Sequence, residues 1–189
     1  MRKRVWVTMA TILILSMVIS CSVDKGTNPG EPDTDRTTPE RLIDFFADAY
    51  ERKDIEKYGE SLDDGYLFVF TPQDADSLGL PPDEPWWGKT EDLASTTKMF
   101  EDSDVSDVQM EILGKEGPWP TEDGVEFRID PSIKVTIEPA GEEPTTYWVY
   151  QSYLYAEIIV DPYDGDLWVF KRITEEPKPT AMTVALRGE

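Results

Sequence analysis

The chain of 189 residues contains no histidine and a single cysteine, Cys21. Without histidine it lacks the imidazole that catalytic triads, haem sites and His-rich zinc sites use. One cysteine forms no internal disulfide, and it leaves no second thiolate for a structural zinc or an iron–sulfur cluster. The composition therefore indicates no cofactor, and it leaves acid–base chemistry to carboxylates and tyrosines.

Basic residues are also scarce. The 18 Lys and Arg residues face 39 Asp and Glu residues, which gives a formal net charge of −21. A surface this negative repels the phosphates of nucleic acids and the headgroups of anionic lipids. We therefore expect no nucleic-acid partner. The length is typical of one domain with appendages.

Acidic residues are missing from the first twenty positions, and this segment has a distinct character. It is basic at residues 2–4 and then apolar, with three hydroxyl residues, from Val5 to Ile19. The apolar run is shorter than the roughly 20 residues that span a bilayer. A basic start, a short apolar stretch and the small residue Ser20 predict a secretory signal peptide over residues 1–20.

The end of this segment, VISC, resembles the bacterial lipobox, in which a small residue precedes an invariant cysteine. The resemblance implies cleavage between Ser20 and Cys21, a diacylglycerol on the Cys21 thiol and acylation of the new amino group. Val18 and Ser20 are variants of the usual Leu and Ala or Gly. The alternative is an uncleaved anchor helix with an unmodified cysteine.

A lipidated Cys21 would hold the chain on a membrane of the cell envelope, because two or three acyl chains anchor a protein stably. Ser22 follows the cysteine where Asp would mark retention in the inner membrane, so the sorting pattern points to the outer membrane in a Gram-negative cell. Residues 21–38, rich in Gly, Pro and Asp, are predicted to form a flexible tether.

The predicted domain covers residues 39–173 and begins with helices. Thr38 and Pro39 suit the start of a helix, and an apolar stripe follows from Leu42 to Tyr50. Asp54 is expected to cap a second helix that runs to Leu62. A strand over residues 66–70 comes next, then a long proline-rich loop.

The second half of the domain is mostly strand. Thr90 is expected to cap a third helix with Leu93, Thr97 and Phe100 on one side. Period-two alternation predicts strands around residues 108–112, 125–129, 133–137, 145–160 and 167–173. The order predicts an α+β fold in which N-terminal helices pack on an antiparallel sheet of about five or six strands. Residues 174–189 are expected to form a loose tail.

The stretch LIDFFADAYERKDIEKYGESLDDGYLFVF, together with WWGKTEDLASTTKMF, resembles the nuclear-transport-factor-2-like superfamily, which includes SnoaL-like cyclases and ketosteroid isomerases. The resemblance covers residues 39–173 and implies a cone-like fold, in which a curved sheet wraps on a helix and leaves a pocket at the open end. A pocket of this kind implies a small molecule as partner, and the expected envelope location leaves an envelope protein as the alternative. Relatives often dimerise through the sheet face, so a homodimer stays open.

The resemblance also implies where catalytic groups would lie. The isomerase tyrosine falls on or next to Phe46, and the base falls on Phe70 or Thr71, so neither position can serve. We therefore predict an envelope lipoprotein with a non-catalytic binding or scaffolding domain. The alternative is a cyclase, isomerase or dehydratase that uses carboxylates or Tyr66, Tyr150 or Tyr153, although adjacent acids such as those at 63–64 occur by chance in so acidic a chain.

Two further segments are candidates for ligand contact. Trp86 and Trp87 on the proline-rich loop could stack on a flat ligand together with Tyr66, or they could simply pack the end of the cone. Three acids, Asp161, Asp164 and Asp166, could hold calcium. The segment DPYDGD more simply predicts a hairpin turn, because Asp-Gly supplies the required backbone conformation.

Overall fold

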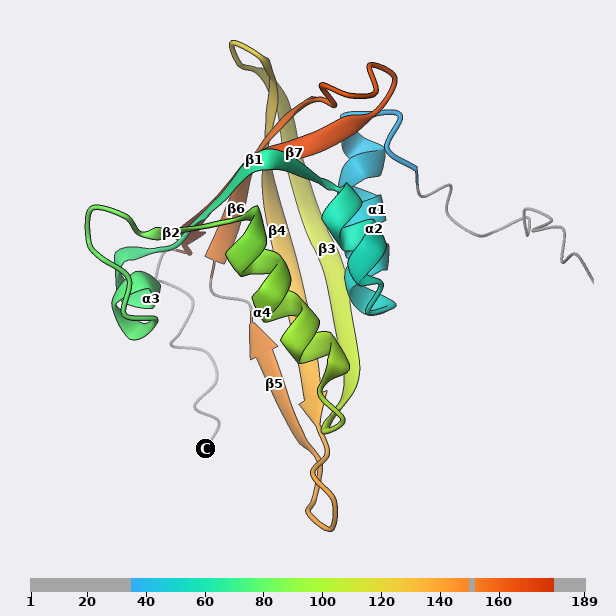
Figure 1. Ribbon diagram of the computed structural model, residues 1–189, viewed down its shortest axis with the longest axis vertical. Coiled ribbons are helices and arrows are strands. Elements are labelled where there is room, and N and C mark those ends of the chain that lie inside the picture. Colours follow the sequence, from blue (N-terminus) through green and yellow to red (C-terminus); the bar gives the residue numbers. More distant parts are fainter. Residues whose placement is uncertain (1–34, 150–151, 179–189) are drawn as a thin grey trace, which may run out of the picture. The chain divides into compact units, whose positions relative to one another are not determined.

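The computed structural model describes residues 35–149 and 152–178, apart from the side chain of Val149 (Figure 1). The predicted signal peptide, Cys21, most of the tether, Tyr150 and the end of the tail lie outside the described residues. No helix within the described ranges is both long enough and apolar enough to cross a membrane.

Four helices and seven strands make up the described part. In chain order they are α1 (Pro39–Glu51), α2 (Ile55–Glu60), β1 (Leu62–Val69), α3 (Pro72–Ser77), β2 (Trp86–Gly88), α4 (Lys89–Glu101), β3 (Val105–Pro120), β4 (Gly124–Ile137), β5 (Thr145–Val149), β6 (Ser152–Val160) and β7 (Trp168–Pro177).

The first two helices begin where the sequence predicts. The Thr38 side chain accepts a hydrogen bond from the Arg41 N–H, and Asp54 accepts one from the Lys57 N–H. Both bonds satisfy backbone donors that a helix start leaves free. The predicted stripe of α1 faces inward, with Leu42, Ile43, Phe45, Phe46, Ala47 and Ala49 buried.

The strands form one curled sheet with the order β2-β1-β7-β6-β4-β3, and β5 pairs with β4 beside this path (Figure 1). The α+β fold with helices on a curved sheet is confirmed. One feature differs from the predicted antiparallel sheet, because β1 runs parallel to β7. Parallel neighbours cannot be joined by a short hairpin and need a long connection. Here strands β2, β3, β4, β5 and β6 lie between β1 and β7 in the chain and provide that connection.

The segments expected as two strands at 125–129 and 133–137 are one continuous strand, β4. Conversely, the single strand expected over 145–160 is divided into β5 and β6. Strand β6 pairs with Gly124–Ile129 and β5 pairs with Ile133–Ile137. The change of partner falls at Pro131, which has no N–H to donate to a neighbour.

The proline-rich loop contains two elements that periodicity could not indicate. Thr71 and Pro72 start the short helix α3, and β2 pairs with Val69 to Leu67 of β1. Helix α4 begins one residue before Thr90, with Gly88 at its N-cap and no capping side chain, so the predicted Thr90 cap is wrong.

Two boundaries also moved. Helix α2 ends at Glu60, and Leu62 opens β1 instead of closing the helix, because the strand takes up the acidic turn. Strand β7 continues to Pro177, four residues into the predicted tail, because β6 pairs with it as far as Ser152. At the other end, Arg36 contacts the domain, since its carbonyl accepts from the Trp168 N–H and its guanidinium pairs with Asp161.

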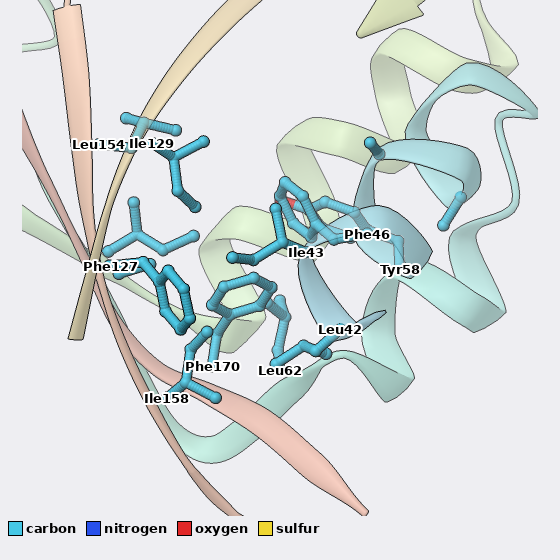
Figure 2. Close-up of a cluster of buried hydrophobic side chains, with 14 of the residues drawn as sticks. Leu42, Ile43, Phe46, Tyr58, Leu62, Phe127, Ile129, Leu154, Ile158 and Phe170 are labelled. Carbon is cyan, nitrogen blue, oxygen red and sulfur yellow. The ribbon is translucent and has the colours of Figure 1, made fainter. Parts of the chain in front are cut away.

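The core lies between α1, α2 and the inner face of the sheet. Figure 2 shows side chains from the two helices, including Phe46 and Tyr58, directed at side chains from β4, β6 and β7. The Phe46 and Phe170 rings meet edge to face with centroids 5.1 Å apart. This apolar cluster fixes the helices on one side of the curved sheet and leaves space toward α4.

Candidate functional site

A cavity of about 460 Å³ opens inside the curled sheet. Every helix and every strand except β5 contributes to its wall, so the cavity is a property of the whole fold. Its lining residues are Phe46, Tyr50, Tyr58, Phe68, Phe70, Asp74, Ser77, Leu78, Trp87, Asp92, Ser95, Thr96, Met99, Met110, Pro131, Ile133, Ser152, Leu154, Ile173 and Glu175. The size falls in the range of small-molecule sites.

Aromatic rings form much of this wall. Phe70 lies between Phe68 and Trp87, with ring centroids 4.8 Å from each, and it meets Trp87 edge to face. Strands β1 and β2 hold these rings together, because Phe68 pairs directly with Trp87 across the ladder. The result is a rigid aromatic surface that a ligand can contact at little cost in side-chain entropy.

Asp92 provides the polar centre of the cavity. It lies in the first turn of α4, and its side chain is buried, with 7% of the residue exposed. The Tyr58 hydroxyl on α2 donates a hydrogen bond of 2.7 Å to Asp92 Oδ2. Burial raises the pKa of Asp92 to about 6, and the bond from Tyr58 acts in the opposite direction by favouring the carboxylate.

Three tyrosines surround this carboxylate. Burial, and next the charge of Asp92, raise the pKa of Tyr50 to about 12 and the pKa values of Tyr58 and Tyr66 well above their ordinary range. All three therefore keep their protons at neutral pH, and Tyr58 and Tyr50 donate them in hydrogen bonds. Tyr50 uses its proton weakly, toward the Met99 sulfur at 3.8 Å.

The structure separates the three residues predicted to contact a ligand. Trp87 lines the cavity, whereas Trp86 does not line it and is 40% exposed. Tyr66 is 1% exposed and belongs to the core beside the cavity. Its hydroxyl is buried with no hydrogen-bond partner among the described residues. Ligand contact by these residues stays a prediction.

That the positions carried over from the isomerases are non-catalytic stays a prediction, and two of these positions lie in the cavity wall. Phe46 is buried and Phe70 is partly buried, and both line an open cavity rather than fill it. Thr71 is buried and caps α3. The buried acidic group of the wall comes instead from α4, at a position to which the resemblance assigned no role.

The segment from Asp161 to Asp166 is a turn between β6 and β7. Asp161 Oδ1 accepts from the backbone N–H groups of Tyr163 and Asp164, and Asp164 Oδ1 accepts from that of Asp166. These carboxylates stabilise the turn itself. Within residues 35–149 and 152–178, no three acidic, His or Cys side chains are grouped to hold a metal ion.

Sequence reasoning missed Asp92, although a signal was present. The buried residues of α4 are Asp92, Thr96 and Phe100, spaced by four, and not the predicted set with Leu93 and Thr97. An acid at a spacing of eight from a core phenylalanine falls on the inward face of a helix. Tyr153, the other described candidate, lies away from the cavity, with Arg128 4.7 Å from its ring centroid.

No protein-family model and no curated protein sequence matches this chain. Solved structures do match the chain. A proposed aromatic ring hydroxylase from Novosphingobium aromaticivorans is 16% identical with a TM-score of 0.55, and the match covers 79% of this chain and 93% of the other. A nuclear-transport-factor-2-like protein from Salmonella enterica is 9% identical with a TM-score of 0.53, covering 78% and 92%.

A proposed scytalone dehydratase from N. aromaticivorans gives the same TM-score of 0.53 at 9% identity, covering 74% and 81%. At such identities the likeness concerns the fold alone. The domain has the cone-like α+β fold of the nuclear-transport-factor-2-like superfamily.

Proposed function

We propose that this protein binds a compact, largely apolar small molecule inside its curled sheet, with Asp92 and Tyr58 fixing the one polar group of that molecule. The observation that carries the proposal is the buried Asp92–Tyr58 pair in the wall of a 460 Å³ cavity that is otherwise mostly apolar and aromatic. Few polar groups in an apolar pocket are the usual arrangement for orienting a small ligand.

We place this pocket at the cell envelope, held there by a lipid on Cys21. The support is the sequence of residues 1–21 and the polar tether that follows it. In this arrangement the anchor keeps the protein near the membrane while the cone takes up its ligand outside the cytoplasm. A binding role needs no further group.

General acid–base catalysis is the second candidate, and one observation favours it. A carboxylate with a pKa of about 6, held 2.7 Å from a protonated tyrosine, is suited both to accept and to return a proton near neutral pH. A hydroxylase and a dehydratase are proposed among the structural neighbours that share this fold. Here Asp92 would exchange the proton and Tyr58 would hold the reacting oxygen.

Filling the cavity tests the binding proposal. Thr96 is buried on α4 and lines the cavity, so Thr96→Phe places a ring inside it; Thr97→Phe adds the same ring on the same helix outside the lining. We expect N-phenyl-1-naphthylamine, a neutral fluorescent probe, to bind the parent and Thr97→Phe, and Thr96→Phe to lose at least about tenfold in affinity. Equal binding by all three chains would refute the proposal.

Catalysis is tested by following the bound molecules themselves. The parent and Asp92→Asn are incubated with ring alcohols and ketones that fit the cavity, and the mixtures are analysed by mass spectrometry. A product formed by the parent and not by Asp92→Asn supports proton transfer by Asp92. Molecules that bind and return unchanged from both chains leave binding as the function.

A further inference from the structure

Among the described residues, the ionisable groups of the cavity wall include no basic side chain. The acids are Asp74, Asp92 and Glu175, and no Lys or Arg of the described ranges lines the cavity. The remaining polar groups are hydroxyls of Ser, Thr and Tyr, which serve ligands of any charge. The wall therefore disfavours an anionic ligand, and its electrostatics favour a positive one.

Asp92 is the most buried of these acids. Its carboxyl group is buried and its hydrogen-bond partner is Tyr58, a neutral donor. None of the ion pairs in the described part of the chain includes Asp92. Lys89, one helical turn away, is engaged instead with the Leu62 carbonyl at 2.7 Å and Asp64 at 3.2 Å.

A buried carboxylate without a cation is an unusual arrangement, because buried charges in proteins are normally paired. Tyr66 adds a second incomplete group beside it, with a buried hydroxyl that has no partner among the described residues. The cavity wall thus carries at Asp92 a negative charge with no cation among the described residues, and a buried hydroxyl without a partner lies in the core beside it. A ligand with a positive charge would satisfy the first.

The aromatic wall favours the same kind of ligand. Phe68, Phe70 and Trp87 form a continuous surface on β1 and β2, and Tyr50 and Tyr58 lie on the helices. Aromatic faces attract ammonium groups, and the attraction increases where water is excluded. Metal cations lack the apolar body that would use these rings.

We propose that the ligand is an organic cation, an ammonium group on a compact apolar body, and that this ammonium group pairs with the Asp92 carboxylate. The inference rests on the proposed small-molecule pocket and names the chemical class that it takes. The apolar body would contact the rings of β1 and β2. The molecule would enter as a preformed cation, so its binding requires no proton transfer.

Affinity should then depend on the charge of Asp92. The titratable groups that face it are Tyr58 from α2, Tyr50 from α1 and Tyr66 from β1, while Asp74 from α3 and Glu175 from β7 lie in the same wall. The tyrosines stay protonated throughout the neutral range. An alkylamine also keeps its charge there, so affinity should rise as the pH goes from about 5 to 8 and Asp92 ionises.

Three naphthyl probes of similar shape differ in charge. They are the cation 2-(1-naphthyl)ethylamine, the neutral 2-(1-naphthyl)ethanol and the carboxylate anion of (1-naphthyl)acetic acid. Binding to the full chain in a non-ionic detergent is measured by calorimetry at pH 7.5, with Thr96→Phe as the baseline for uptake outside the cavity. Asp92→Asn removes the charge with little change in shape. Asp83→Asn removes one from an exposed loop residue outside the cavity and serves as the matched control.

We expect the amine to bind at least about tenfold more tightly than the alcohol, and the carboxylate most weakly. Asp92→Asn should abolish the preference for the amine over the alcohol, while Asp83→Asn keeps this preference. If Asp92→Asn does not fold, loss of the preference in the parent below about pH 5 provides the same evidence.

An alcohol that binds as tightly as the amine, or a preference that survives Asp92→Asn, would overturn the cation proposal while leaving the pocket intact. Failure of all three probes to bind the parent above the Thr96→Phe baseline would overturn the pocket itself. The two proposals therefore fail in distinguishable ways.

Discussion

Asp92 combines two opposing effects at the scale of a single side chain. Removing its carboxylate from water disfavours the charged form, whereas the hydrogen bond from Tyr58 and the position in the first turn of α4 favour it. Burial is the larger effect, so the pKa rises from 3.8 to about 6. The fold thus holds the carboxylate at some cost to stability, as functional sites often do.

This cost predicts a particular pH dependence of stability. A carboxyl group whose pKa is raised by folding takes up a proton between about pH 4 and 6. Its contribution to the free energy of unfolding is therefore fully present below about pH 4 and is lost as the pH rises through about 6. The shift of the Asp92 pKa from 3.8 to about 6 corresponds to a loss on the order of 3 kcal/mol.

Asp92→Asn should remove this dependence. In urea unfolding, the stability of the variant relative to the parent should increase steadily between pH 4 and pH 7.5, because only the parent then carries a buried charge. Asp83→Asn, on an exposed loop residue, should show no such trend. Parallel curves for Asp92→Asn and the parent across this range would contradict the prediction.

Strand β4 shows at the scale of elements what the sequence could and could not predict. The helix α1 was predictable because its cap and apolar stripe are local signals. The continuity of β4 was not, because Pro131 interrupts the alternation while pairing with Ile112 next to an irregularity in the β3–β4 ladder. The division of residues 145–160 into β5 and β6 had no Gly or Pro to mark it. Tertiary pairing with β4 decides it.

The packing of whole elements also brings the residues of the site together. Asp92 and Tyr58 lie 34 residues apart, on helices that meet only because both pack inside the sheet. A local pattern contains no information on such a meeting. The aromatic residues of β1 and β2 were visible in the sequence, but their common face depends on the register that pairs Phe68 with Trp87.

The close approach of β4 and β6 at Gly124 gives a second prediction. A Cβ atom at this position would lie 2.1 Å from the Ile158 carbonyl oxygen, so Gly124→Ala must push the two strands apart. We expect a loss of about 1–3 kcal/mol in the free energy of unfolding, measured with urea. Gly165→Ala, in the turn after β6, meets nothing within 4 Å and should change stability by less than about 0.5 kcal/mol. A larger loss for Gly165→Ala than for Gly124→Ala would be inconsistent with this packing.

At the scale of the whole molecule, the acidic charge and the proposed anchor act in different places. The net charge of −21 belongs to a chain whose first twenty residues carry only basic charges. An acidic domain would be repelled by anionic lipid, so the proposed attachment through a tether would keep it near a membrane without adsorption. The cavity lies in the same acidic domain, and the acids in its wall favour a positively charged ligand.

The anchor gives the last prediction, which concerns Cys21. Because a basic start, a short apolar run and a small residue precede this cysteine, we expect cells that express the chain to attach lipid to its thiol and to remove residues 1–20. A clickable palmitate analogue should label the parent and not Cys21→Ala. Ser22→Ala, which keeps the thiol and changes only the neighbouring residue, should label like the parent. Label retained by Cys21→Ala would refute the lipid site, and a mature mass that includes residues 1–20 would favour the alternative of an uncleaved anchor helix.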